Sequence, residues 1–295
     1  MINALYSLQY YPKFNFVSLF DTASYMQAGS RILSGQVDRL RTPAYPLFLM
    51  LCSFLSGGEG DKMRLFAGII QIAVFFISMY FFYRIAEHFI ENAFLQCFAV
   101  VVYGCASIII NYHVMLLTES FSISGIVIFA FLLIRYVETN RPLFIIWASA
   151  AAWIITMIRP SGLFLFVAAA LLMAGVCVNR RTAPPKSALI AFMLSVALIF
   201  GYMGLNLWQN KYFGLSSVSD INQFYDVAIA GICKDNSDQE IAKALQEQID
   251  GGLSPLGAAI ETERNFASYD RSIESDHSIR KPFGAISRNL SGFYG

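Results

Sequence analysis

Long uncharged stretches of apolar residues fill the middle of the chain and alternate with short polar segments. A helix needs about 20 apolar residues to cross ~30 Å of hydrocarbon, with a range of roughly 17–25. Four stretches reach this range, and two slightly shorter ones can be accommodated by snorkelling of their polar ends or by local thinning of the bilayer. The pattern predicts six membrane-spanning helices, at 65–83, 93–110, 120–134, 143–158, 161–178 and 187–208.

An amphipathic pattern precedes the first predicted span. Asp21, Tyr25, Ala28 and Ile32 recur at helical spacing, which predicts a helix with these four side chains on one face. Asp21 has two interpretations at this point. It either caps the start of the helix, a common role for aspartate, or serves as a catalytic carboxylate.

The apolar run at 44–55 is too short to cross a bilayer, so we expect an interfacial or re-entrant helix there. Pro43 and Pro46 disfavour helical backbone at the residue before each of them, and we expect an extended turn around them. Arg41 lies just before this turn. Its guanidinium either binds lipid headgroups at the membrane surface or holds a functional phosphate through two parallel hydrogen bonds.

The C-terminal part of the chain is polar, with 20 of the 41 charged side chains in residues 209–295. Ser237 and Glu240 form a capping box, and an apolar stripe runs from there to Gly251, so we expect a scaffold helix. The chain is therefore divided into an external loop segment with interfacial helices, a transmembrane bundle and an external, mostly helical polar tail that we expect to be truncated: 1–64, 65–208 and 209–295.

Composition narrows the class of protein further. Charged residues make up 14% of the chain, against about 25% in a typical soluble domain, and the net charge is +1. These values exclude an ordinary soluble enzyme, a disordered chain and a nucleic-acid binder with a basic face. The five cysteines form no CxxC pair and the three histidines are dispersed, so no metal site is expected. Nucleotide-binding and hydrolase motifs are also absent from the sequence.

Basic residues in the short loops predict the orientation. Six lie in the loops at 84–92, 135–142 and 179–186, against only Arg159 in the alternate loops. The first set of loops is therefore predicted to be cytoplasmic. Residues 1–64, the segment before Glu119, the turn at Arg159 and the tail then share the opposite face.

Two further charged residues on that face are candidates for a site. Glu119 opens the third predicted span, where an acid is either a favourable start to the helix or a functional carboxylate that faces water or a partner. Arg159 lies between two spans with almost no loop. It either snorkels to lipid headgroups or binds phosphate in a cavity.

Four strings together resemble the GT-C superfamily of integral-membrane glycosyltransferases, in particular the bacterial branch related to dolichyl-phosphate-mannose protein mannosyltransferases. The likeness covers about residues 20–215. The strings are Asp21-x3-Tyr25-x2-Ala28 with Gly35, Arg41-Thr-Pro43-Ala-Tyr45-Pro46, Leu117-Thr118-Glu119 and Arg159-Pro160.

The resemblance implies transfer of a sugar from a polyprenyl-phosphate donor to an acceptor at the external, or periplasmic, face of the plasma (inner) membrane. It implies that Asp21 is the general base, with Glu119 as a second catalytic candidate. Tyr25, Arg41, Tyr45 and Arg159 are the implied substrate-binding residues. The acceptor is a glycan, a lipid or a protein, and metal dependence varies within the superfamily. Members of the family have a span before the first external loop and further spans after the polar region, so we expect this chain to be a fragment.

Two other classes of function remain open from the sequence. A transporter or flippase of lipid-linked saccharides would place ionisable residues near mid-membrane and often carries an internal repeat, whereas the predicted spans carry no mid-span charge and no repeat is found. A non-catalytic membrane scaffold would tolerate replacement of both Asp21 and Glu119.

Overall fold

The computed structural model describes residues 20–217 together with Glu247 and Gly251. Its contacts divide the chain into two units, 1–216 and 217–295, and the helices between Phe20 and Asn210 lie in the first. The predicted tail helix that begins at Ser237 lies almost entirely outside the described residues. The side chain of Asp21 is also outside them, although its backbone is described.

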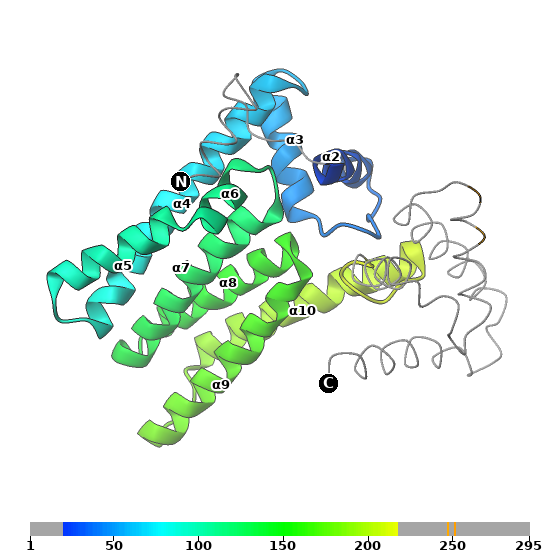
Figure 1. The fold of residues 1–295 in the computed structure, drawn as a ribbon. Coiled ribbons are helices and arrows are strands. Elements are labelled where there is room, and N and C mark those ends of the chain that lie inside the picture. The colour runs from blue at the N-terminus through cyan, green and yellow to red at the C-terminus, as the bar shows by residue number, and fades with distance from the viewer. Residues whose placement is uncertain (1–19, 218–246, 248–250, 252–295) are drawn as a thin grey trace. The chain divides into compact units, whose positions relative to one another are not determined.

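The described part of the chain is helical and contains no β-strand, as predicted (Figure 1). Short connections of a few residues join most of the helices. The elements are α2 (Phe20–Leu33), α3 (Ala44–Ser56), α4 (Asp61–Phe89), α5 (Ala93–Cys105), α6 (Ser107–Val114), α7 (Thr118–Thr139), α8 (Pro142–Ile158), the 3-10 turn η1 (Pro160–Gly162), α9 (Leu163–Arg180) and α10 (Lys186–Asn210).

Four of these elements are long and apolar enough to cross a membrane: α4, α7, α9 together with η1, and α10. A fifth crossing results if α5 and α6, which meet at a bend of 49°, form one broken span. The prediction of a multi-pass helical membrane protein is therefore confirmed, but the predicted number of six is not. The expected span at 143–158 forms α8, which has 17 residues and is about 25 Å long at 1.5 Å per residue.

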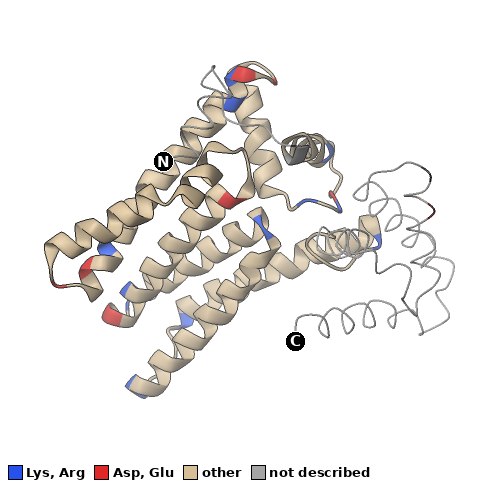
Figure 2. Cartoon of the chain, in the orientation of Figure 1, with Lys and Arg blue, Asp and Glu red and all other residues tan. Residues whose placement is uncertain are grey.

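Polar contacts sort the helix ends into two groups at opposite ends of the bundle. At one end the C-terminal turns of α4 and α7 meet, where His88 Nδ1 lies 2.6 Å from Glu138 Oε1. Arg180 at the end of α9 donates to the carbonyl of Val137 at 2.7 Å. At the other end Arg159, after α8, contacts Glu119 at the start of α7. Figure 2 shows the same division, because charged residues gather at helix ends and the middles of the helices are free of them.

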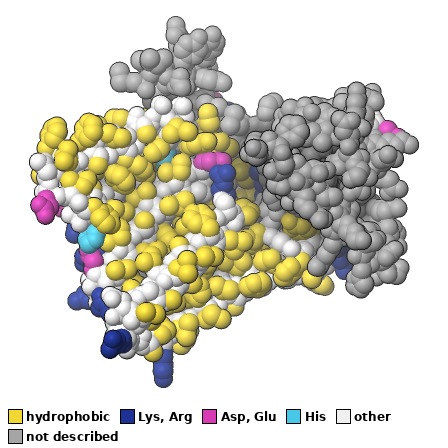
Figure 3. All heavy atoms as spheres, turned by 60° about the horizontal axis from the view of Figure 1, so that its bottom comes forward, with side chains coloured by type: hydrophobic (Ala, Val, Ile, Leu, Met, Phe, Trp, Pro, Cys, Tyr) yellow, Lys and Arg dark blue, Asp and Glu magenta, His cyan; other side chains and the backbone are white. Residues whose placement is uncertain are grey.

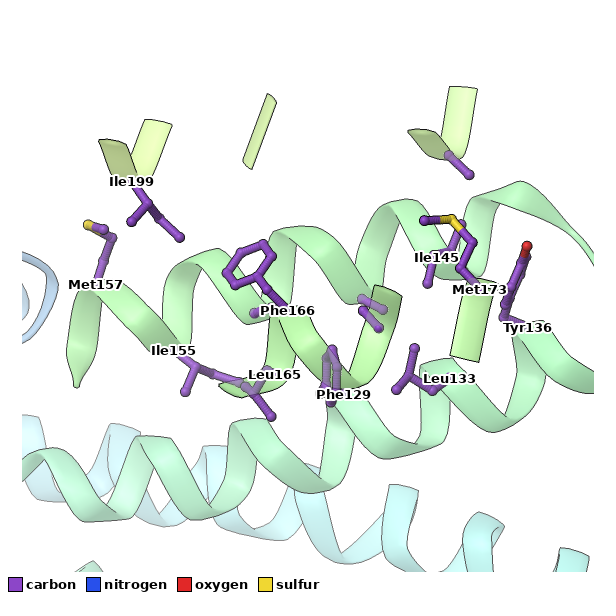
Figure 4. Packing of buried hydrophobic residues seen from close by; sticks show 14 of the residues in the cluster. Phe129, Leu133, Tyr136, Ile145, Ile155, Met157, Leu165, Phe166, Met173 and Ile199 are labelled. Carbon is purple, nitrogen blue, oxygen red and sulfur yellow. The ribbon is translucent and has the colours of Figure 1, made fainter. Parts of the chain in front are cut away.

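The main core lies where α8 packs between α7 and α10. Ala148 and Ala152 of α8 are fully buried, and small residues at this spacing let helices approach closely. A Cβ added at Gly125 of α7 would lie 2.8 Å from Ile155 of α8, so these two helices are in close contact there. Figure 4 shows Phe129 of α7 in the same layer of side chains as Ile155 and Leu165.

The outer faces of the long helices are also apolar. Large side chains such as Phe76, Leu171, Val178 and Ile190 are exposed on α4, α9 and α10. Figure 3 shows hydrophobic side chains covering most of the described surface on the face that it displays. An exterior of this kind fits contact with lipid tails, since a monomeric soluble protein rarely exposes so much contiguous apolar surface.

The amphipathic helix predicted after residue 20 is present as α2, which packs on α3. Tyr25 and Ala28, which were predicted to share one face of this helix, are 6% and 1% exposed. The extended turn expected around Pro43 and Pro46 is wrong, because α3 begins at Ala44 and Pro46 lies inside its first turn. Proline is tolerated there because backbone N–H groups in a first turn have no partner within the helix.

Candidate functional site

Glu119 and Arg159 form an ion pair at one end of the bundle. Arg159 Nη1 lies 2.7 Å from Glu119 Oε1, and the hydroxyl of Thr118 donates to Glu119 Oε2 at 3.1 Å. The side chains are 24% exposed for Glu119 and 43% exposed for Arg159, so both remain accessible to solvent or a ligand. Two residues that the sequence proposed independently are thus in direct contact.

Arg41 lies in the loop before α3 and is held by α2. Its Nε donates to Ser24 Oγ at 3.0 Å and its Nη1 donates to Tyr25 Oη at 3.2 Å. The guanidinium carbon lies 4.4 Å from the centre of the Tyr25 ring, within the range of a cation–π contact. Position 21 is one helical turn before Tyr25 on the same helix, so the backbone of Asp21 begins the face that contacts Arg41.

Asp38 organises the loop that carries Arg41, and sequence reasoning missed it. Its Oδ1 accepts hydrogen bonds from the backbone N–H groups of Leu40 at 2.9 Å and Arg41 at 2.8 Å. Its Oδ2 lies 2.9 Å from Nη1 of Arg31, and the side chain is only 2% exposed. An aspartate placed two and three residues before the N–H groups that it binds is a turn signal, so the sequence did contain a pointer to this role.

Contacts with α8 and α10 anchor the same loop. Thr42 Oγ1 donates to the carbonyl of Ile158 at 2.9 Å, which places the residue after Arg41 beside the residue before Arg159. The side chain of Gln209 accepts from the N–H of Val37 at 2.6 Å and donates to the carbonyl of Gly35 at 3.3 Å. The two candidate arginines therefore flank one hydrogen bond between the loop and the end of α8.

Gly35 lets the chain turn from α2 into this loop. Its φ of 83° lies in the left-handed region, which costs a glycine little. The N–H of Gln36 closes the helix end by donating to the carbonyl of Arg31 at 3.0 Å.

Tyr45 is in the core and is 1% exposed. Its hydroxyl donates to Gln71 Oε1 at 2.9 Å, and its ring meets the Tyr25 ring edge-on with centroids 4.9 Å apart. Burial, then the neighbouring Tyr25 and Glu119, raise the pKa of Tyr45 well above its ordinary value. Tyr45 thus packs against Tyr25 from within the core. Among the candidate site residues, Arg41, Glu119 and Arg159 have partly exposed side chains.

The segment before Glu119 is fixed by two further hydrogen bonds. Gln71 Nε2 donates to the carbonyl of Met115 at 2.9 Å, and the hydroxyl of Thr22 donates to the carbonyl of Leu116 at 3.3 Å. Thr22 directly follows Asp21 in α2. The backbone at position 21 therefore lies at the same end of the bundle as Glu119, as the sequence predicted.

An apolar groove of about 590 Å³ lies between α3, α8 and α10. It contains Pro43, two residues after Arg41, and Met157, two residues before Arg159. The lining of the groove thus comes within two residues of each arginine along the chain, although neither arginine is part of it. Its other lining residues are Ala44, Leu47, Trp153, Ala197, Leu198, Gly201, Tyr202 and Leu205.

No cluster of three or more histidine, cysteine, aspartate or glutamate side chains that could hold a metal ion occurs among the described residues. His113 is buried, with Nε2 3.2 Å from Ser124 Oγ and Nδ1 2.7 Å from the carbonyl of Ile109. The contact with Ser124 joins α6 to α7, and the contact with Ile109 lies within α6. His88 lies at the other end of the bundle, beside Glu138.

The fold and the contacts together define a multi-pass, all-helical protein, with partly exposed Arg41, Glu119 and Arg159 at one end of an apolar helix bundle. Neither a scan against protein-family models nor searches of curated proteins and of solved structures found a match to this chain.

Proposed function

We propose that this chain is a membrane glycosyltransferase that moves a sugar from a polyprenyl-phosphate donor to an acceptor hydroxyl. The observation that carries the proposal is the hydrogen bond from Thr42 to Ile158, which brings the segments that carry Arg41 and Arg159 together where both segments also contribute to the lining of an apolar groove. A lipid phosphate has the matching chemistry, an anion joined to a long apolar chain. The resemblance of the strings around Asp21, Arg41, Glu119 and Arg159 to GT-C glycosyltransferases points to the same donor.

The phosphate is the leaving group in this reaction. Guanidinium groups bind phosphate oxygens through paired hydrogen bonds, and they stabilise the charge that develops as the bond from the sugar to the phosphate breaks. Arg159 is paired with Glu119 in the structure. In the proposed reaction the phosphate takes over part of that pairing, so Glu119 holds the arginine in place before the donor binds.

Asp21 is the proposed general base. The acceptor oxygen attacks the anomeric carbon, the bond from this carbon to the phosphate oxygen breaks, and polyprenyl phosphate leaves with the electron pair. The proton of the acceptor hydroxyl passes to the carboxylate of Asp21. A base in this role contributes about 10²–10⁴ to the rate. Support comes from the position of residue 21 one turn before Tyr25, on the helix that holds Arg41.

We assign the site to the external face of the plasma membrane, because the short loops at the other end carry six basic residues. This assignment includes six crossings, with α8 counted as one and the bent pair α5 and α6 as another. Arg135 lies 5.7 Å from the centre of the Phe144 ring near the start of α8, while Arg159 follows the end of α8 at the site. The ends of α8 therefore belong to opposite groups, which supports counting it as a crossing.

One observation favours transport of a lipid-linked saccharide as a second candidate function. Helix α5 is broken from α6 by a bend of 49°, and broken helices are typical of transporter binding sites. His113 is a buried residue of α6, and the buried side chain of Gln71, from α4, donates to its carbonyl at 3.4 Å. A flippase would move the intact donor across the bilayer without breaking its sugar–phosphate bond.

The test uses the full chain in membrane vesicles with a radiolabelled polyprenyl-phosphate sugar and a mixed acceptor extract. We expect label to leave the donor and appear in acceptor, and Asp21→Asn to lower this rate by about 10²–10⁴ while expression and thermal stability stay unchanged. Glu91→Gln, which neutralises an exposed carboxylate just after α4 at the opposite end of the bundle, is the matched control and is expected to transfer normally. Movement of intact donor with no loss of label would contradict transfer and favour the flippase.

A further inference from the structure

A second pocket, polar and about 400 Å³ in volume, lies on the side of α2 that faces away from Arg41. Residues of α2 line one wall, including Gln27 and Ser30, and the loop and first turn of α4 line the other with Glu59 and Arg64. Its size lies within the range of about 300–1,000 Å³ that is usual for small-ligand sites. It differs from the apolar groove because hydroxyl, amide, carboxylate and guanidinium groups are all present.

The two faces of α2 contact different parts of the protein. Ser24 and Tyr25 point to Arg41, as their hydrogen bonds show. Gln27 and Ser30 lie on the opposite face and line the polar pocket. Thr22, at the start of the helix, lines the pocket and also bonds to the segment before Glu119. The pocket therefore reaches the end of α2 that carries position 21, where Thr22 also contacts the segment before Glu119.

The lining carries no net charge from its ionisable residues. The negative charge of Glu59 and the positive charge of Arg64 sum to zero. The guanidinium of Arg64 forms its ion pair with Asp61, in the first turn of α4. A strong anion such as a phosphate would meet the carboxylates of Glu59 and Asp61, and a cation would meet the guanidinium of Arg64. This charge balance favours an uncharged ligand.

The hydrogen-bonding groups of the pocket suit a ligand with many hydroxyls. Gln27 and Ser30 both donate and accept, Glu59 accepts and Arg64 donates. A sugar ring offers a donor and an acceptor on each hydroxyl, so it can use such a mixed set, whereas a lipid chain would leave these groups without partners. Met26 and Met63, which are 8% and 4% exposed, also line the pocket and present apolar surface to the C–H groups of a ring.

We propose that this pocket binds a neutral carbohydrate, and that this carbohydrate is the acceptor of the reaction. The second statement rests on the proposed function, while carbohydrate binding itself does not. A saccharide in the pocket that extended past Thr22 would reach the end of α2 where residue 21 lies. The acceptor is thus assigned to glycans, free or as the headgroup of a glycolipid, and not to proteins.

The experiment measures binding of the full chain, purified in lipid nanodiscs, to an array of immobilised neutral and acidic oligosaccharides. We expect retention on neutral glycans. Ser30→Trp, which fills the pocket from an exposed position, is expected to weaken retention by at least about tenfold, and Gln27→Ala by a similar amount. Gln36→Ala is the matched control, because Gln36 is exposed in the loop after α2 and outside the pocket. Thermal unfolding of each variant checks that the fold is intact.

The outcomes separate this inference from the proposed function. Retention lost in Ser30→Trp and Gln27→Ala but kept in Gln36→Ala and Arg159→Ala supports the pocket as a glycan site. No retention on any glycan, retention only on acidic glycans, or equal loss in Gln36→Ala would overturn it. Vesicles that carry the retained glycan as a lipid headgroup, compared with the free oligosaccharide, distinguish the two sources. Glycan binding without any transfer of label would refute only the acceptor role and the proposed function.

Discussion

Glu119 and Arg159 are joined by an ion pair of 2.7 Å between the start of α7 and the end of α8. The pair links two helices that also pack along their length, so it connects the candidate site to the main core. Because both side chains are partly exposed, the pair contributes little to stability, about 0.2–1 kcal/mol for a pair of this kind.

Reversal of both charges tests whether this pair only links α7 to α8 or also takes part in the proposed sugar transfer. Arg159→Glu alone places two carboxylates together and is expected to lower the apparent melting temperature in detergent. Adding Glu119→Arg is expected to restore the melting temperature, because the ion pair is re-formed with opposite polarity. Sugar transfer is expected to stay low in the double variant, since the guanidinium is then on α7. Recovery of transfer along with stability would mean that the pair acts only as a structural link.

Replacement of Arg41 by lysine tests whether its planar guanidinium is needed. Arg41→Lys is expected to weaken use of the polyprenyl-phosphate donor by about tenfold, because an ammonium cannot form the paired hydrogen bonds of a guanidinium. The measurement is the donor concentration at half-maximal transfer. Arg39→Lys is the control, because Arg39 lies in the same loop but stacks 5.2 Å from the Tyr212 ring. Equal donor use by wild type and Arg41→Lys would favour simple contact with lipid headgroups.

Asp38 is predicted to be the main stabilising residue of the loop that carries Arg41. Asp38→Ala removes the acceptor of two backbone N–H groups and the partner of Arg31. We expect the free energy of unfolding to fall by about 1–3 kcal/mol, since buried donors are left without a partner. Asp61→Ala, where the side chain is 65% exposed, should change it by less than about 0.5 kcal/mol. Similar melting temperatures for the two variants would disprove this role.

Sidedness can be measured with reporter fusions. A reporter fused after Arg141 or Lys186 is expected to report the cytoplasm, and one fused after Lys211, at the end of α10, the external side. The reason is the excess of basic residues in the loops at 84–92, 135–142 and 179–186. A cytoplasmic signal at Lys211 would place the arginine site on the wrong face for a donor presented outside the cell.

The sequence by itself determined the helical, membrane-spanning character of the chain. Inside a bilayer the backbone N–H and C=O groups must bond to each other, because no water is present. A long apolar segment that crosses the bilayer therefore folds as a helix. The bounds of α8 were predicted to within one residue, whereas α7 extends beyond the predicted span at 120–134 and runs from Thr118 to Thr139. Helical periodicity predicted that Tyr25 and Ala28 share one face of a helix, and the structure shows that both are buried.

The tertiary structure decided which polar residues meet. Glu119 and Arg159 are 40 positions apart, and their contact depends on how α7 packs against α8, which residue spacing does not encode. The same holds for the burial of Tyr45 against Gln71 and for the anchoring of Val37 by Gln209. Packing also decided that α3 begins at Ala44 despite its prolines, because Tyr45 and Leu49 are buried on its inner face. Local sequence rules describe one segment at a time, whereas these contacts arise only when several helices share one core.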